Sequence, residues 1–553
     1  MTAPLDQLLL GATVATPLLL ALPAARSGTG GRWLLVLAAL PAFISSLLVA
    51  DGTTLDLPWL LLGAQLGLDG AGRILLFASA AVWLAAALHA VTGDGLRGVG
   101  ARAGFALAMA GNFGVVLAQD PAGFFAWYAL MSFAAYLLVV EAGDAAAWRA
   151  GRVYLALVVL GEVLILSGLL AAVQAGEAHA ASAARWLLWI GFGIKAGLVP
   201  LHFGLPLAYG VAPTAGGTAL AGAMVNAGLL GWLRFLAPDG APAETLGLAM
   251  IALGLAGAFY GAGVGVLQSS AKALLGYSSV SQMGLLAIGV GAGVAVPDAW
   301  PFLLVVVTLY AAHHAFAKAA LFVGLGVVER TGSRAAWLAL ALPAVALVGL
   351  PLTSGAVVKS ALKAALPVLP APWSEALALG LPLAAVGTTL LMARLLFLAA
   401  PRGAAASPAG LPWAAYAPLL LAVGLGPWWI GPVPLPPASW LAALWPGLAG
   451  AAIAGAAFAA WRQRRWRTGP TVSPGDVLVP LERIASRVWR HLTPAPESHH
   501  PADRAPAAVP PPARQLAALL ARGERGLTRW ESVGIAVVLL SLAVAAASAL
   551  RGH

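Results

Sequence analysis

Residues 191–235 read GFGIKAGLVPLHFGLPLAYGVAPTAGGTALAGAMVNAGLLGWLRF. Most of this stretch is apolar enough for a lipid bilayer, yet it contains Lys195, His202 and three prolines. Because a charge at bilayer depth is costly, a lysine there is a functional candidate by default. Pro200 and Pro206 remove backbone donors around His202, and an interrupted helix in a membrane must face protein or a water-filled cavity. The stretch therefore predicts a broken transmembrane helix with a buried lysine beside the break, as an ion path requires.

The composition of the whole chain is typical of a polytopic membrane protein. Of its 553 residues, 61% are hydrophobic and 9% are charged, and the mean hydropathy is +0.89. There is no cysteine, which excludes disulfides, thiol catalysis and iron–sulfur ligation, and no haem or flavin motif is visible. We therefore expect no cofactor, no metal and no catalytic residue in this chain, so that any redox chemistry belongs to partner subunits.

Apolar runs of about 20 residues predict the membrane spans. The N-terminus lacks the basic region of a cleaved signal peptide, so we expect the first run to be retained as a helix. Sixteen helices are predicted, at 8–25, 33–50, 72–91, 103–119, 121–142, 153–174, 184–205, 214–235, 244–266, 272–293, 300–328, 336–368, 376–400, 412–431, 439–461 and 532–550.

The loops between these runs predict an orientation through the positive-inside rule. With the N-terminus outside, basic residues gather in alternate loops, whereas loops such as 51–69 and 238–244 carry acids and almost no bases. We therefore expect a multi-pass protein of a bacterial cytoplasmic (inner) membrane with both termini in the periplasm.

Residues 462–531 interrupt the apolar pattern with a basic, proline-rich segment. Between Arg462 and Arg529 there are 12 Lys/Arg and 5 Asp/Glu, which account for +7 of the formal net charge of +10. Such a segment suits acidic lipid headgroups or a partner subunit rather than nucleic acid. We expect amphipathic helices at 477–492 and 515–530 joined by the proline-rich tract. The adjacent His499 and His500 are interpreted as solvated linker rather than a metal site.

The first stretch also carries a resemblance to a known family. The matching residues are Lys195, Pro200-Leu201-His202, Leu205-Pro206, Ala208 and Ala212-Pro213-Thr214-Ala215-Gly216. They are similar to the central motif of the antiporter-like subunits of respiratory complex I and of the Mrp-type cation/proton antiporters. The resemblance covers roughly residues 100 to 400. It implies two inverted five-helix repeats, each containing a broken helix.

A second interrupted helix is predicted at residues 349–355, GLPLTSG, which are followed by Lys359. This segment resembles the family's second broken helix, whose ionisable residue stands at the position of Lys359. The alternative for Lys359, and more so for Lys363, is a side chain that extends to the membrane interface.

Residues 313–322, HHAFAKAALF, lie between the two breaks and resemble the family's central helix. His314 and Lys318 are four residues apart and share one helix face, so a proton can pass between them through a water. Lys272 matches the start of the family's tenth helix, where the alternative is a simple anchor. The predicted proton pathway comprises Lys195, His202, Lys318, His314, His313, Lys359, Glu162 and Lys272.

The first half departs from the family's pattern where acidic residues belong. Counting back from Tyr136 places Ala129 at the position of the family's glutamate, and Leu207 replaces an aspartate. Asn226 stands where some members carry a lysine, and it can bind a water but cannot carry the charge.

Two acids could replace the missing glutamate. Glu141 is 12 residues beyond Ala129, roughly 18 Å along a helix, and is a poor substitute. Glu162 on the predicted sixth helix is the better one, although it could instead be a structural partner of Arg152 or of a neighbouring subunit.

These observations predict an all-α polytopic membrane subunit that translocates protons, or exchanges protons for cations, within a complex of several membrane subunits. One alternative is an energy-coupling subunit for inorganic-carbon (CO2/bicarbonate) accumulation, and another is a scaffold that transports nothing. The sequence leaves open the ion, the energy source, the direction and the partners. The expected divisions are N-terminal helices at 1–100, antiporter halves at 101–235 and 236–400, further core helices at 401–461, the linker at 462–531 and a last span at 532–553.

Overall fold

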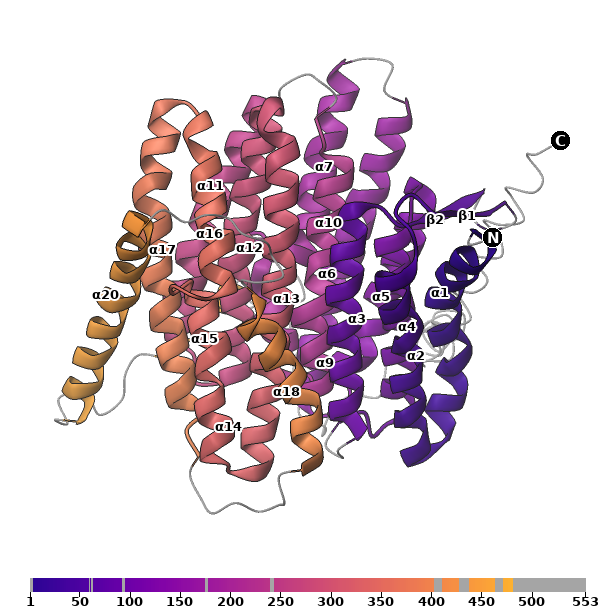
Figure 1. The fold of residues 1–553 in the computed structure, drawn as a ribbon, viewed down its shortest axis with the longest axis horizontal. Helices are drawn as coiled ribbons and strands as arrows, with labels where there is room; N and C mark the ends of the chain where they lie inside the picture. Colours follow the sequence, from indigo (N-terminus) through magenta and orange to yellow (C-terminus); the bar gives the residue numbers. More distant parts are fainter. Residues whose placement is uncertain are drawn as a thin grey trace, which may run out of the picture. The chain divides into compact units, whose positions relative to one another are not determined.

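The computed structural model describes residues 3–58, 60, 63–91, 95–174, 178–238, 243–401, 410–426, 437–462 and 471–480. Contacts divide the chain into two units, of which the first comprises residues 1–56 and 65–479. The second comprises 57–64 and 480–553, and nearly all of it lies outside the described residues. The long helices of the first unit lie alongside one another, as expected for a membrane bundle (Figure 1).

The N-terminal part of the bundle follows the predicted order. Its helices are α1 (Ala3–Arg26), α2 (Gly28–Leu48), α3 (Gly70–Val91), α4 (Val99–Leu117), α5 (Pro121–Val139) and α6 (Ala145–Gln174). Between α2 and α3, two short strands pair, β1 (Thr54–Leu57) and β2 (Ala64–Gly67). The expectation of an all-helical chain is wrong at this point. The strands are only four residues long, and their alternation is too brief to stand out from an ordinary loop.

The first predicted helix break is present. Helix α7 (Ala178–Ala196) ends one residue after Lys195, and Gly197 takes a φ of +87° that favours glycine. A short 3₁₀ turn, η1 (Leu201–Phe203), contains His202 and leads into α8 (Gly204–Val211). The chain then continues through α9 (Thr214–Ala219), the π-helical turn η2 (Leu220–Met224) and α10 (Val225–Phe235). The break therefore places His202 beyond the end of the helix that carries Lys195.

Two long helices, α12 (Ala271–Ala295) and α13 (Trp300–Thr331), form the centre of the bundle. Helix α11 (Glu244–Val266) packs along α12, and α12 is followed by η3 (Pro297–Ala299) and α13. The membrane-length part of α12 is entirely buried, and α13 is buried along most of its length. Gly254 and Gly284 allow α11 and α12 to approach closely, because a Cβ on Gly284 would lie 2.4 Å from the Gly254 carbonyl oxygen.

The second predicted break is present as well. Helices α14 (Arg334–Ala339) and α15 (Ala341–Val348) are followed by Gly349, with a φ of +88°, and by Leu352, with a φ of +67°. The Thr353 hydroxyl caps α16 (Ser354–Ala365) by accepting a hydrogen bond from the Ala356 N–H. The remaining elements are η4 (Leu366–Val368), α17 (Ala371–Leu398), α18 (Gly410–Gly424) and α20 (Pro437–Arg462).

Eleven helices in the described part of the chain are long and apolar enough to cross a membrane, compared with the sixteen predicted. Part of the difference has a physical cause, because the predicted spans at 214–235 and 336–368 are divided by a π turn and by the second break. The predicted span at 532–550 lies outside the described residues. The count of sixteen, the inverted repeats and the domain boundaries therefore stay predictions.

Candidate functional site

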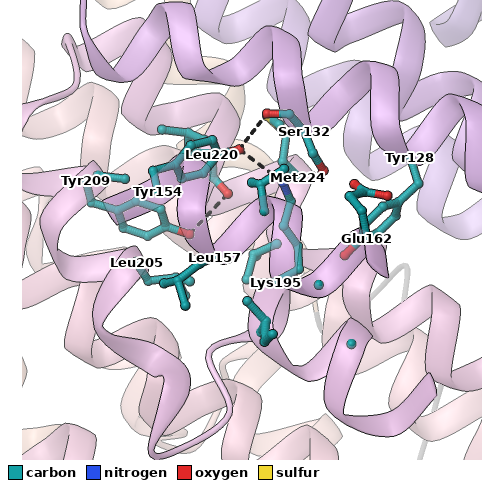
Figure 2. Close-up of a pocket in the computed structure, with 17 residues that line it drawn as sticks. Tyr128, Ser132, Tyr154, Leu157, Glu162, Lys195, Leu205, Tyr209, Leu220 and Met224 are labelled. Carbon is teal, nitrogen blue, oxygen red and sulfur yellow. Dashed lines mark hydrogen bonds between the residues drawn. The ribbon is translucent and has the colours of Figure 1, made fainter. Parts of the chain in front are cut away.

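A cavity beside the first helix break contains Lys195. Its volume is about 50 Å³, and its walls come from α5, α6, α7, α8 and the segment from Leu220 to Val225. A single water needs roughly 10–15 Å³ on the same measure, so the cavity has room for a few waters. Figure 2 shows the Lys195 side chain inside it, with Glu162 and Tyr128 on one side and Tyr154 and Tyr209 on the other.

Two hydroxyl groups hold the Lys195 ammonium group. Nζ of Lys195 donates to Oγ of Ser132 at 3.1 Å and to the hydroxyl of Tyr154 at 3.2 Å. The Tyr154 hydroxyl in turn donates to the Ser132 carbonyl oxygen at 3.0 Å. The ammonium also lies 5.9 Å from the ring centroid of Tyr128 and 5.5 Å from that of Tyr154, within the range of cation–π attraction. Helices α5, α6 and α7 thus jointly fix the position of this lysine.

Glu162 is the acidic residue that lines this cavity. It is buried on α6, which packs against α7, and it interacts electrostatically with Lys195. Neither carboxylate oxygen has a hydrogen-bond partner among the described residues. A buried carboxylate without direct partners is costly unless water or a nearby cation compensates it, and this cavity contains Lys195 and has room for water. The structure therefore brings Glu162 and Lys195 together.

The other acid considered from the sequence lies elsewhere. Oε1 of Glu141 accepts a hydrogen bond from the Arg97 N–H at 2.7 Å, just beyond the end of α5. Burial raises the pKa of the Glu141 carboxyl, while the N–H groups of Arg97 and Gly98 oppose that shift. Ala129 is partly exposed and is not among the residues that line the cavity, although Tyr128 and Ser132 on the same helix are.

The three residues of α13 in the predicted pathway, His313, His314 and Lys318, are buried. Nζ of Lys318 donates to the Leu275 carbonyl oxygen of α12 at 2.9 Å. Four residues earlier, His314 has no hydrogen-bond partner for either ring nitrogen among the described residues. Nδ1 of His313 lies 2.8 Å from the hydroxyl of Ser354, the first residue of α16. This contact links α13 directly to the second break.

Lys359 lies at the second break, as predicted. Its ammonium donates to the Leu347 carbonyl oxygen at 2.5 Å and to that of Val348 at 3.1 Å, which are the last carbonyls of α15. A cation there complements the partial negative charge of the helix end. Lys359 also acts electrostatically on His313. Lys363, by contrast, is exposed, and the alternative that its side chain extends to the membrane interface stays a prediction.

The remaining predicted residues lie apart from the Lys195 cavity. Nζ of Lys272 donates to the Ala212 carbonyl oxygen at 3.3 Å, near the start of α12, which suits an anchor. His202 is fully buried, and its Nε2 lies 3.6 Å from Oδ1 of Asp476. Asn226 is buried on α10, where its amide donates to the Gly222 carbonyl at 3.1 Å.

Sequence reasoning missed three polar residues that the structure places at these sites. Ser132 and Tyr154 bind Lys195 from other helices, and Asp476 reaches His202 from the segment that follows α20. Ser132 stands four residues before Tyr136 in a stretch that already resembled the family, so it could have been marked. Tyr154 and Asp476 carry no comparable signal.

The chain matches the family described as "NADH:quinone oxidoreductase/Mrp antiporter, TM" over residues 118–398, just over half its length. It is 31% identical over 227 residues to hydrogenase-4 component B of Escherichia coli strain K12, covering 37% of this chain and 34% of that protein. It is 40% identical over 159 residues to NADH-quinone oxidoreductase subunit M of Pseudomonas aeruginosa, covering 27% and 30%. The matches thus span about a third of the length of these curated relatives.

Two solved structures share the fold. A chain in the structure of the Mrp complex from Dietzia sp. DQ12-45-1b has a TM-score of 0.62 and 23% identity, covering 74% of this chain and 83% of that one. A chain of the membrane-bound sulfane sulfur reductase, an archaeal respiratory membrane complex, has a TM-score of 0.64 and 19% identity, covering 81% and 99%. The resemblance inferred from the helix breaks is therefore confirmed: this chain belongs to the NADH:quinone oxidoreductase/Mrp antiporter transmembrane family.

Proposed function

We propose that this chain translocates protons, or exchanges protons for cations, as one membrane subunit of a larger complex. The observation that carries the proposal is the cavity in which Lys195 and Glu162 lie together beside a helix break, with room for water. An amine and a carboxyl that share a buried, hydrated space can exchange a proton when either one is moved or neutralised.

The hydroxyl groups around Lys195 give the cavity a defined geometry. Ser132 and Tyr154 accept from the ammonium and therefore hold the lysine when it is charged. Because the oxygens of Glu162 have no fixed partner among the described residues, this carboxylate is free to bind water or a proton. Protonation of Glu162 would remove the charge that favours the ammonium and release a proton from Lys195.

In this proposal, the proton pathway continues into the second antiporter half, residues 236–400. Lys318, His314 and His313 follow one another along α13, and His313 meets Ser354 at the second break. Lys359, at the same break, is held by the carbonyls of α15. A proton that reaches Lys318 can thus be passed toward Lys359 through imidazole groups and interspersed water. We assign Lys272 the role of an anchor at the N-terminal end of α12.

Eleven apolar helices in the described part of the chain, together with membership of the family, make this a multi-pass membrane protein. The two structural neighbours come from a complex described as Mrp and from an archaeal respiratory membrane complex. These relatives support our proposal that the chain works beside other membrane subunits in a bacterial inner membrane. The positive-inside pattern supports the proposal that both termini face the periplasm.

The test is proton flux in proteoliposomes that contain the intact, copurified complex. Lys318→Ala should reduce flux to the background of empty vesicles, and Lys195→Ala should lower it to a residual level that is still measurable, whereas Lys363→Ala, at an exposed lysine, should leave it unchanged. Mass spectrometry of each purified complex checks that the subunits are still assembled. Wild-type flux in a fully assembled Lys318→Ala complex would exclude this role, and an absence of flux in the wild type would favour a scaffold.

A further inference from the structure

Residues 471–480 fold back onto the first helix break. The Val472 N–H donates to the Leu267 carbonyl oxygen at the end of α11, at 3.2 Å. Leu478 packs against the buried cluster formed by Leu157, Ile194 and Phe203, the last of which adjoins His202. This short segment, which belongs to the predicted cytoplasmic linker, is therefore attached at both of its ends.

The turn between these two attachments brings a carboxylate to His202. Nε2 of His202 lies 3.6 Å from Oδ1 of Asp476, whose side chain is 7% exposed, and the Tyr260 hydroxyl of α11 donates to Oδ2 of Asp476. Neither ring nitrogen of His202 has a hydrogen-bond partner among the described residues. Burial alone would raise the pKa of Asp476, but contacts with His202, Tyr260 and the Val477 N–H outweigh it and hold the pKa below its usual range.

We propose that residues 472–478 form a cover over the first helix break, and that Asp476 is the fixed counter-ion of His202, so that protonation of His202 tightens the cover. The counter-ion role rests on the proposed function, because it requires that His202, a member of the predicted proton pathway, accepts protons at the first helix break. The cover itself rests on the contacts alone.

The surroundings of the pair favour a charge interaction over an incidental contact. His202 is fully buried, so its charged form needs a nearby anion, and Asp476 is the acid that the described structure places against it. The other titratable groups that face the pair are Tyr260 of α11 and Tyr277 of α12. Lys195 on α7 and Tyr209 on α8 line the neighbouring cavity instead.

The experiment measures whether the cover responds to the charge of His202. The chain has no cysteine, so single cysteines can be placed at two positions of the cover: at Leu478, which packs against the buried cluster, and at the exposed Ser473, as a reference for thiol reactivity. Maleimide labelling rates are measured on the intact complex in detergent, where both membrane faces are accessible. The ratio of the Leu478→Cys rate to the Ser473→Cys rate is followed from about pH 6 to about pH 8, where histidine loses its charge.

We expect this ratio to be far below one near the lower pH and to rise across the range in which histidine loses its charge. Asp476→Asn should raise the ratio at the lower pH and abolish its pH dependence, and His202→Gln should do the same. Asp476→Glu should retain the dependence, and Asp298→Asn, at an exposed acid, should leave it unchanged. Tyr260→Phe, which keeps the carboxylate but removes one of its donors, should give an intermediate ratio.

A wild-type ratio near one would show that no cover exists. A pH dependence that survives Asp476→Asn would show that Asp476 is not the counter-ion. If Asp476→Asn assembles poorly, the milder Tyr260→Phe variant decides, because an unchanged ratio there contradicts the proposed contact. These rates are independent of transport, so a failure of the proposed function appears only as absent proton flux.

Discussion

Removing the carboxylate from the Lys195 cavity should slow proton transport in a way that depends on Lys195. Glu162→Gln keeps the size of the side chain and removes its charge. Lys195 then keeps its contacts with Ser132 and Tyr154 but loses the acidic residue that lines its cavity. We therefore expect Glu162 and Lys195 to behave as one coupled unit.

The expected magnitude follows from the geometry. Two unit charges about 4 Å apart interact by roughly 4 kcal/mol at an effective dielectric constant near 20. Glu162 and Lys195 make no hydrogen bond to each other, so their coupling should lie below this value. Coupling energies of neighbouring charged residues are about 0.5–3 kcal/mol, and every 1.4 kcal/mol is about tenfold in rate. We expect Glu162→Gln to lower flux by roughly 10- to 100-fold, with most of this effect shared with Lys195.

The assay is proton flux in proteoliposomes for the wild type, Glu162→Gln, Lys195→Ala and the double variant. Glu375→Gln, at an exposed carboxylate of α17, is the matched control and should transport normally. The double variant should be no slower than the slower single variant. Fully additive losses on a logarithmic scale would mean that the two residues act independently, and the reasoning from their shared cavity would be refuted.

Three further predictions concern the segment after α20 and the orientation of the chain. Gly475→Ala, at a φ of +83°, should strain the cover by about 1–2 kcal/mol and speed labelling of Leu478→Cys by roughly tenfold; an unchanged rate would contradict the strain. Because the folded pKa of Asp476 is depressed, its stabilising effect is present above about pH 4 and is lost as the pH falls through the folded pKa. The ratio of Leu478→Cys to Ser473→Cys labelling should therefore also rise at strongly acidic pH, and Asp476→Asn should lack that rise. In intact cells, an impermeant maleimide should label Ser182→Cys but not Ser473→Cys, and the reverse pattern would overturn the predicted topology.

The helix breaks were predictable because their causes are local. Proline and glycine disrupt backbone hydrogen bonding wherever they occur, so the interruptions after Lys195 and after Val348 could be inferred from a few residues. Helix α11 has the bounds predicted for it, because its apolar run is uninterrupted. The hairpin of β1 and β2 was missed, since two four-residue strands leave little periodicity to detect.

The site was predictable only in part, because its contacts join distant segments. Lys195 and Glu162 were identified as intramembrane charges, which are rare enough to mark function. Tyr154, however, binds Lys195 across 41 positions of sequence, and Asp476 meets Tyr260 across 216. The sequence around a single tyrosine on a helix, or around a single acid in a turn, contains no pattern that predicts a contact with so distant a residue.

The acids missing from the family's pattern at Ala129 and Leu207 suggest that position in space matters more than position in sequence. Glu162 enters the Lys195 cavity from α6, and Asp476 follows Gly475, where a Cβ would lie 3.0 Å from the Leu207 side chain. Since an electrostatic effect depends on where the charge stands and not on which element carries it, we propose that each acid serves in place of the missing one.

This reasoning leads to a rescue experiment. Ala129 lies on α5 between Tyr128 and Ser132, both of which line the Lys195 cavity, so a longer acidic side chain there should reach the cavity or its rim. Ala129→Glu should therefore restore part of the flux lost in Glu162→Gln, whereas Ala129→Gln, its uncharged counterpart, should not. The rescue should disappear when Lys195 is alanine, because the added carboxylate then has no amine to serve. Equal flux from Ala129→Glu and Ala129→Gln in the Glu162→Gln background would contradict this reasoning. It would show that a carboxylate at position 129 of α5 does not interact with Lys195 and cannot replace Glu162.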